Sequence, residues 1–484
     1  MPEPAPKPTA LPLWLGGRPV ETGSWLDVID KWRGGTLARA ARADRSVLEA
    51  AIESSVEGFD ALRDWPAWRR AAVLRQVADA LQADRRRFAE ALVFEAGKPI
   101  QFAEAEVDRA LDTLRLGAEE ATRICGEHVP LDGSPRGETY EGWVKRFPIG
   151  PCALITPFNF PLNLVCHKIA PAIAAGCSFV LKPAPATPVT ALLLGELLAR
   201  TDLPTGAFSI LPCSNEDAAA LVDDERLRML SFTGSVRVGW QLRGQAPRKR
   251  MTLELGGNAA CIVDRDADLG FAVDRIVFGA FSQAGQSCIS VQRVFVHAEV
   301  QPQFRELLLE RVDRLQTGEP LDHATFLSPL ISDTAAERVE GWIHRAVTAG
   351  AQVLCGGTRR GAFVAPTVVE DVPDDQPLVC EEAFGPVLTL ATFEDLDDVI
   401  ARANDRRMGL QAGIFTDSIE RARRAFDRLE VGGVVLGDIP SARVDAGECV
   451  TRFRHTLSLT GSRRQPRRRA RPARRRRSSA GAAP

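Results

Sequence analysis

Apolar residues recur every three or four positions through residues 45–124, as in 71–81, and alternate with faces rich in Arg and Glu. This spacing is typical of amphipathic helices and predicts three or four of them. The next segment, 126–147, is rich in Gly, Pro and β-forming residues around Trp143. It predicts a β-hairpin that projects between larger units.

After residue 148 short apolar runs alternate with helical segments. The runs cover 152–155, 178–181, 208–211 and 229–232, and the helical segments cover 162–175, 187–199 and 236–243. The alternation resumes over 259–436, with helices near 267–281, 300–315, 335–349, 396–403 and 419–429. Strand and helix in alternation indicate doubly wound parallel sheets. We therefore predict an α/β fold with two such sheet domains.

The length of 484 residues suits two or three domains, and 45% hydrophobic with 26% charged residues is typical of a globular protein. No apolar run approaches the roughly 18 residues that a membrane helix needs. The apolar cluster within residues 1–17 is too short for the core of a signal peptide. We therefore expect a cytoplasmic protein without a membrane span.

The ten cysteines include no C-x-x-C pair. This spacing favours reduced, mostly buried thiols over a disulfide framework, and it gives no reason to expect a metal site.

Charge is unevenly distributed, because all 63 acidic residues lie at or before Glu448 whereas 12 arginines follow it. Residues 446–484 are expected to form a disordered tail. One explanation for its composition is a frameshift, because a GC-rich gene read out of frame encodes mostly Arg, Ala, Pro and Gly, the residues found there. The alternative is a basic arm that binds nucleic acid. The lack of aromatic residues after Phe453 argues against specific single-strand binding.

Five motifs occur in a fixed order. They are Ile-Thr-Pro-Phe-Asn-Phe-Pro at 155–161, Ser-Phe-Thr-Gly-Ser at 231–235, Leu-Glu-Leu-Gly-Gly-Asn at 253–258, Gly-Gln-Ser-Cys at 285–288 and Glu-Glu-Ala-Phe-Gly-Pro at 381–386. Together with the 34 residues that separate Glu254 from Cys288, they resemble the aldehyde dehydrogenase superfamily over roughly residues 14–445. The resemblance implies an NAD(P)-dependent oxidoreductase.

The resemblance also predicts the domain organisation. Residues 1–124 and 148–256 are expected to form a Rossmann-like NAD(P)-binding domain, 125–147 a β-hairpin oligomerisation arm, and 257–445 the catalytic domain. The family's Pro-Tyr-Gly-Gly-type loop, short helix and final strand do not follow Asp445. A homo-oligomer, dimer or tetramer, is therefore expected only if the atypical C-terminus permits it.

Three residues carry the expected chemistry. Cys288 follows a glycine and two small or polar residues, an exposed setting that suits a nucleophilic thiolate. Asn159 would stabilise the oxyanion formed when the thiolate attacks an aldehyde, with the Cys288 N–H as second donor. Glu254, at an apolar strand end beside two glycines, would activate water for thioester hydrolysis. The structural alternatives are a turn asparagine at 159 and a buried hydrogen-bonding anchor at 254. Lys168 resembles a supporting lysine of the family.

The expected cofactor site lies where a strand closes and a helix opens at Gly234, because free N–H groups there bind phosphate. By resemblance the site contains Lys182, Thr233, Gly234, Ser235, Gly256, Glu382 and Phe384. Lys182 would contact the adenosine ribose or its 2′-phosphate, and Glu382 the nicotinamide ribose. Pro185 stands where many NAD-dependent members carry a glutamate, so both NAD and NADP stay open.

The expected substrate is a small polar aldehyde. The segment 159–168 and the Gly-Gln-Ser-Cys motif are similar to members that oxidise lactaldehyde, succinate semialdehyde or, without phosphorylation, glyceraldehyde 3-phosphate. Arg443 and His167 are candidate substrate residues, and a plain surface arginine is the alternative for Arg443. Two alternatives remain for the whole chain: an impaired homologue with a frameshifted C-terminus, and a coenzyme A-acylating enzyme, which Glu254 argues against.

Overall fold

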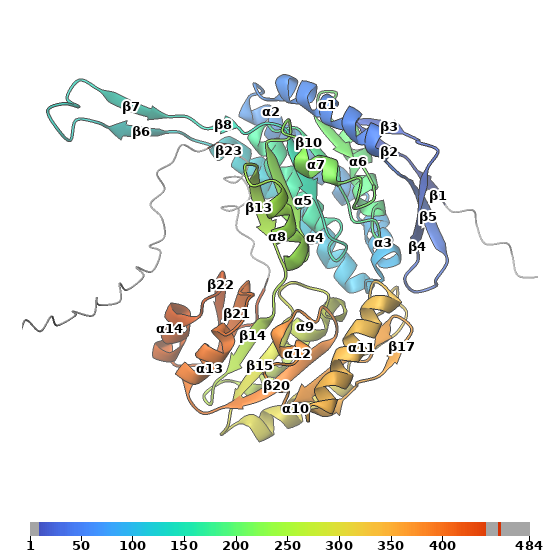
Figure 1. The fold of residues 1–484 in the computed structure, drawn as a ribbon, viewed down its shortest axis with the longest axis vertical. Helices are drawn as coiled ribbons and strands as arrows, with labels where there is room; N and C mark the ends of the chain where they lie inside the picture. Colours follow the sequence, from blue (N-terminus) through green and yellow to red (C-terminus); the bar gives the residue numbers. More distant parts are fainter. Residues whose placement is uncertain (1–8, 442–453, 456–484) are drawn as a thin grey trace, which may run out of the picture.

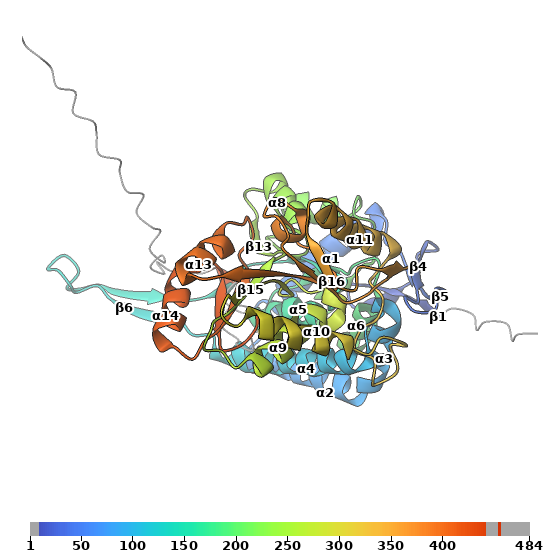
Figure 2. The same ribbon diagram turned by 90° about the horizontal axis from the view of Figure 1, so that it is seen from below.

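A computed structural model describes residues 9–441 and 454–455. Two seven-stranded sheets with helices packed against them form the two halves of the body, and a long two-stranded arm extends from one half (Figure 1). This α/β architecture confirms the predicted fold class. Figure 2 shows the same arrangement from below, with the arm on one side.

The N-terminal region begins with short strands that the apolar pattern did not predict. They are β1 (Thr9–Leu11), β2 (Leu13–Leu15), β3 (Arg18–Val20), β4 (Trp25–Ile29) and β5 (Thr36–Ala41). Three to six residues are too few to show a clear period of two. Four helices follow, in agreement with the three or four that the spacing of apolar residues predicted. They are α1 (Arg45–Leu62), α2 (Ala67–Ala83), α3 (Arg85–Ala96) and α4 (Ile100–Arg123).

The first large sheet has the strand order β13-β12-β9-β10-β11-β2-β3. Its central strands are β9 (Cys152–Ile155), β10 (Phe179–Lys182), β11 (Phe208–Ile210), β12 (Met229–Thr233) and β13 (Arg250–Glu254). They run parallel, whereas β2 pairs antiparallel with β11, so the sheet is mixed rather than wholly parallel. The connecting helices are α5 (Asn163–Ala175), α6 (Val189–Ala199), α7 (Ala219–Asp223) and α8 (Val236–Gln245).

The second large sheet has the order β16-β19-β20-β15-β14-β21-β22. Its strands are β14 (Ala259–Val263), β15 (Val291–His297), β16 (Gln352–Cys355), β19 (Thr367–Glu370), β20 (Val387–Phe393), β21 (Gln411–Phe415) and β22 (Gly433–Leu436). Only the edge strand β16 is antiparallel to its neighbour. The helices are α9 (Leu269–Phe281), α10 (Gln301–Asp313), α11 (Asp333–Thr348), α12 (Pro377–Cys380), α13 (Leu396–Asn404) and α14 (Ile419–Arg428). A short hairpin joins β17 (Arg359–Arg360) to β18 (Phe363–Val364).

The arm is the predicted hairpin, in which β6 (Glu127–Pro130) pairs antiparallel with β7 (Glu141–Val144). The chain then returns to the body through β8 (Phe147–Pro148), which pairs with β23 (Arg454–His455). The two residues of β23 lie in the segment that was expected to be a disordered tail, and for them this expectation is corrected. They form a strand because the backbone N–H and C=O groups of β8 can pair with an extended segment.

No helix of the described part of the chain combines the length and the apolar character that a bilayer span requires.

Candidate active site

The candidate cofactor and catalytic residues of the first sheet lie along one edge. Asn159 follows β9, and Lys182, Thr233 and Glu254 are the last residues of β10, β12 and β13. These strands are parallel, so their carboxyl ends share an edge. The strand order reverses at β9, with β10 on one side and β12 on the other. In doubly wound sheets ligands bind at the carboxyl edge beside such a reversal.

Two glycines bring this edge into contact with the second half of the protein. A Cβ on Gly256 would overlap the carboxylate of Glu382, and one on Gly257 would overlap the carbonyl of Cys288. The Gly257 N–H donates a hydrogen bond of 3.0 Å to Glu382 Oε1. The Glu254 strand end, the Glu382 loop and the Cys288 loop therefore meet at one place.

The loop before Cys288 has an unusual backbone. Within the 3₁₀ turn Ser282–Gly285, Gln283 and Ala284 have φ of 55° and 54°, and Gly285 has φ of 68°. Left-handed conformations of non-glycine residues cost about 1 kcal/mol or more each and persist where surrounding contacts enforce them, often at functional sites. The turn delivers Cys288 to the meeting point of the two halves.

The expectation of an exposed Cys288 is corrected, because the side chain is half-buried between the two halves. Burial, together with Glu382 and Glu254, raises the pKa of the Cys288 thiol to about 12, and Arg109 acts in the opposite direction. The thiol is therefore protonated at neutral pH. Attack on a carbonyl requires a base or a positive charge next to the sulfur.

Asn159 connects the two halves from the other side. Its side chain is 4% exposed, and its Nδ2 donates to the carbonyl of Gln286, two residues before Cys288, at 2.9 Å. Its own carbonyl accepts hydrogen bonds from Lys98 Nζ and from Gln283 Nε2. An asparagine that only stabilises its own turn does not need these long-range contacts, so the geometry favours the functional interpretation.

Two carboxylates act electrostatically on Cys288. Burial raises the pKa of Glu382 to about 7, against the effects of the Gly257 N–H and of Arg338. Arg338 of α11 also donates to the carbonyls of Glu382 and Ala383, at 3.2 and 2.8 Å. Glu254 ends β13 and is half-buried. The site therefore holds two carboxylates that can compete for the role of base.

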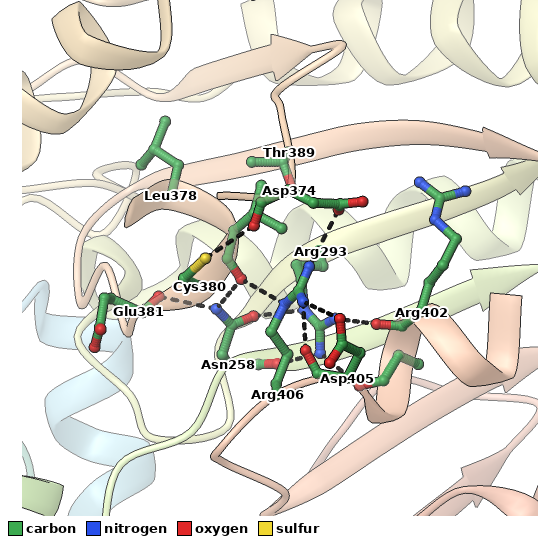
Figure 3. A network of polar contacts seen from close by, with 12 residues as sticks. Asn258, Arg293, Asp374, Leu378, Cys380, Glu381, Thr389, Arg402, Asp405 and Arg406 are labelled. Carbon is green, nitrogen blue, oxygen red and sulfur yellow. Dashed lines mark hydrogen bonds and ion pairs between the residues drawn. The ribbon is translucent and has the colours of Figure 1, made fainter. Parts of the chain in front are cut away.

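A buried polar network that the motifs did not reveal fixes the loop around Glu382. Asn258 Nδ2 donates to the carbonyls of Val379 and Glu381, both at 2.9 Å, and Arg293 Nε donates to Asn258 Oδ1 at 2.6 Å (Figure 3). Neighbouring Gln292 donates to the same Glu381 carbonyl at 2.8 Å. The signal in the sequence was a Gln-Arg pair inside the mostly apolar strand β15, every residue of which is buried.

The remaining predicted residues lie around this centre. Lys182, 3% exposed, donates to Asn215 Oδ1 at 3.1 Å. Lys168 of α5 donates to Ser231 Oγ of β12 at 2.8 Å. Ser235 caps the N-terminus of α8, where its Oγ accepts from the Val238 N–H. Phe384 packs edge to face on Phe158, with ring centroids 5.7 Å apart.

Two further predictions concern the candidate substrate residue Arg443 and the expected lack of a metal site. Arg443 lies outside the described residues. Among the residues that are described, no His, Cys, Asp and Glu side chains cluster as metal ligands would.

Sequence reasoning missed Arg109 on α4, which sits beside the candidate nucleophile. Its guanidinium lies 4.7 Å from the ring centroid of Phe160, and burial lowers its pKa. Its Nε is buried without a hydrogen-bond partner in the described part of the chain. Arg109 affects the pKa values of both Cys288 and His167, so its positive charge acts on the candidate nucleophile and on a candidate substrate residue. In the sequence it is one of many charged residues on a helix.

His167 is expected to destabilise the folded protein in acid. Burial lowers its pKa to about 4 from 6.5, helped by Arg109 and Lys168. The unfolded chain therefore binds the proton more readily, and stability is fully present above pH 6.5 and lost as the pH falls towards 4. Relative to His167→Asn, the wild type should lose about 2 kcal/mol between pH 7 and pH 5 in urea unfolding. The control is His344→Asn, at an exposed position. If both variants changed the pH dependence of the unfolding free energy equally, the prediction would be contradicted.

Comparison with known proteins gives the family of the chain. The model of the aldehyde dehydrogenase family matches residues 19–448. A 3-sulfolactaldehyde dehydrogenase of Priestia megaterium is 40% identical over 435 residues, 90% of this chain and 91% of that protein. Aspartate-semialdehyde dehydrogenase 1 of Pseudomonas canavaninivorans is 39% identical over 87% of this chain and 90% of its own length.

Solved structures give the same result. Aldehyde dehydrogenase 21 from Physcomitrella patens, crystallised with the reaction product succinate, superimposes with a TM-score of 0.89 at 44% identity, over 90% of this chain and 92% of that one. Structures of NAD-dependent and NADP-dependent enzymes also match. The chain thus belongs to the aldehyde dehydrogenase family, whose members oxidise aldehydes to acids with NAD or NADP.

Proposed function

We propose that this enzyme oxidises a small aldehyde that carries an anionic group to the corresponding carboxylic acid. The observation that carries the proposal is Arg109, a half-buried guanidinium beside Cys288 with an Nε that lacks a partner. A buried donor without an acceptor costs free energy unless a ligand satisfies it. A carboxylate or sulfonate suits a guanidinium because the two pair through charge-assisted hydrogen bonds.

The names of three relatives agree with an anionic substrate. Sulfolactaldehyde carries a sulfonate, aspartate semialdehyde a carboxylate, and the moss enzyme was solved with the dicarboxylate succinate. His167, with its low pKa, is a neutral imidazole at pH 7 and offers hydrogen bonds rather than charge. We therefore assign the anchoring charge to Arg109 rather than to His167.

The proposed reaction has two stages. In the first, Glu254 or Glu382 takes the proton of the Cys288 thiol and releases it to solvent, and the thiolate attacks the aldehyde carbon. The oxyanion of the thiohemiacetal accepts hydrogen bonds from Asn159 and from the Cys288 N–H. Loss of a hydride from the same carbon leaves a thioester on Cys288. In the second, Glu254 takes a proton from water, the hydroxide attacks the thioester, and the acid leaves with Cys288 restored as the thiol.

The cofactor accepts the hydride when it is bound, and the carboxyl edge of the first sheet fits a dinucleotide. Gly256 lets the Glu382 carboxylate approach the end of β13, Ser235 opens α8, and buried Lys182 offers a positive charge. We assign these residues, with Thr233, Gly234 and Phe384, to the NAD(P) site. We assign Lys168 a supporting role, because it donates a hydrogen bond to Ser231 of β12.

The first experiment is an absorbance assay for the reduced nicotinamide, with NAD and NADP each paired with succinate semialdehyde, 3-sulfolactaldehyde and lactaldehyde. Anionic aldehydes should give the higher kcat/KM. A preference for lactaldehyde, the uncharged second candidate, would contradict the anionic substrate. An acyl thioester formed on addition of coenzyme A would contradict hydrolysis. Silence with every pair from a protein that binds cofactor would support the alternative of an impaired homologue.

Arg109→Met should lower kcat/KM for succinate semialdehyde about 10- to 100-fold, because one charge-assisted hydrogen bond contributes roughly 1.5–3 kcal/mol. Turnover of lactaldehyde should change little, since that substrate has no anion to anchor. The matched control is Arg115→Met on the exposed side of the same helix. Equal losses with both substrates would show that Arg109 acts on the site as a whole and not on the anion.

We also propose that the arm binds a second copy of the chain. Its residues Tyr140 and Trp143 are 65% and 75% exposed, an unusual position for large aromatic side chains. Light scattering should give at least the mass of a dimer, and Trp143→Ser should reduce it. A monomeric wild type would contradict this proposal.

A further inference from the structure

A fully buried ion pair lies beside the site but outside all five motifs. The side chains of Lys98 and Glu106 form a salt bridge and are both 0% exposed. Lys98 follows Gly97 at the end of α3, and Glu106 belongs to α4. Taking two charges out of water costs several kcal/mol per ion unless further hydrogen bonds complete the pair. The other partners of the two side chains therefore show what the pair does.

Those partners all lie in the segment that carries Asn159. Lys98 Nζ donates to the Asn159 carbonyl at 3.1 Å and lies 4.4 Å from the ring centroid of Phe160. Glu106 Oε1 accepts from the N–H groups of Leu162 and Asn163, both at 3.0 Å. The pair thus holds both ends of residues 159–163.

The contacts of Glu106 meet a need of α5. Leu162 occupies the cap position of this helix, and no side chain of its own N-terminal segment makes a cap hydrogen bond. Glu106 supplies the missing acceptor and a negative charge at the positive end of the helix dipole. Because α5 starts four residues after Asn159, fixing its first turn also fixes where the Asn159 segment ends.

The second half of the protein fixes Asn159 from the opposite direction. Gln283 donates to the same carbonyl as Lys98, and Asn159 Nδ2 donates to the Gln286 carbonyl. The backbone of Asn159 is therefore held between the buried pair and the loop that carries Cys288. Loss of either hold would let the Asn159 amide move relative to the sulfur.

We propose that Lys98 and Glu106 are positioning residues, which hold the Asn159 amide where the oxyanion forms. The inference rests on the proposed role of Asn159 in the reaction. It goes beyond that role because neither residue of the pair contacts the reacting atoms.

Lys98→Met tests the proposal, because methionine keeps the length of the side chain without its donor. The rate of hydride transfer in a single turnover should fall about 10- to 100-fold, less than the roughly 10²–10³-fold loss typical of removing an oxyanion donor outright. The affinity for NAD(P) and the rate of Cys288 alkylation by iodoacetamide should stay within about twofold of the wild type. In the Asn159→Ala background Lys98→Met should cause almost no further loss, since the amide it positions is gone.

A matched control exists in the same buried cluster. Glu95 is also fully buried, and it caps α6 by accepting from the N–H groups of Val189 and Thr190, at 2.7 and 3.0 Å. Its contacts lie away from residues 159–163. Glu95→Gln should change stability without changing the rate of hydride transfer.

Glu106→Gln provides a second variant should Lys98→Met fail to fold, because glutamine keeps an acceptor for the α5 N–H groups but loses the charge opposite Lys98. It should reproduce the slower hydride transfer. Wild-type hydride transfer in the folded variant, or losses that multiply with Asn159→Ala, would overturn the inference while leaving the proposed function intact. A wild-type rate in Asn159→Ala itself would instead overturn the role of Asn159 in the proposed function, and the inference with it.

Discussion

Cys288→Ser is expected to abolish aldehyde oxidation while leaving cofactor binding intact. Serine has nearly the same size, so the loop Ser282–Gly285 and its contacts should persist. A hydroxyl is a much weaker nucleophile than a thiol and far harder to deprotonate. The Cys288 thiol already has a pKa of about 12 because of burial and of Glu382 and Glu254, so the site has no margin for a less acidic group. Loss of a nucleophile lowers turnover by about 10⁴-fold or more.

The measurement is formation of reduced nicotinamide in single and multiple turnovers, with cofactor affinity measured on the same preparation. Cys355→Ser is the control, because Cys355 is also half-buried but lies on the edge strand β16 of the second sheet. It should keep wild-type activity. Substantial turnover by Cys288→Ser would exclude Cys288 as the nucleophile.

The fold was predictable where short apolar runs are fully buried. All residues of β9, β10 and β11 are buried, and most of them are apolar, so these short runs stand out from the flanking helices. Strands β1 and β3 are three residues long and mostly exposed. Strand β1 pairs with the distant strand β5, which the local pattern does not encode, and β3 pairs with the adjacent short strand β2.

The candidate site was predictable where its residues belong to local motifs. Asn159, Glu254 and Cys288 each stand in a short run with glycine or proline, and the structure brings these runs together. Arg109 and Lys98 were not found, because a charged residue near a helix usually faces solvent. Their burial arises only when α4 packs against α5 and the segment before it. The exposed setting expected for Cys288 was also wrong, because the two halves of the protein meet at the thiol and bury part of it.

Two carboxylates near Cys288, Glu382 and Glu254, are candidates for the base that activates water, and each has one argument in its favour. Glu382 has a pKa raised to about 7, a value suited to a general base at neutral pH. Its carboxylate, however, accepts a hydrogen bond from the Gly257 N–H and occupies the space that a side chain at position 256 would need. Glu254 ends the strand β13, is half-buried and acts electrostatically on Cys288. Paired substitutions separate the two.

Glu254→Gln is expected to form reduced cofactor once per site in a rapid burst and then to turn over about 10²- to 10³-fold more slowly, because the thioester on Cys288 waits for an unassisted water. The acylated enzyme should accumulate and be visible by mass spectrometry of the intact protein. Glu382→Gln is the matched control: with its role at the nicotinamide ribose, it should slow the burst itself and raise the KM for the cofactor, without trapping the thioester. If the two variants exchange these behaviours, Glu382 is the base, and its pKa near neutrality explains the choice. If neither variant shows a burst, deacylation does not limit turnover and a group other than these two carboxylates activates water.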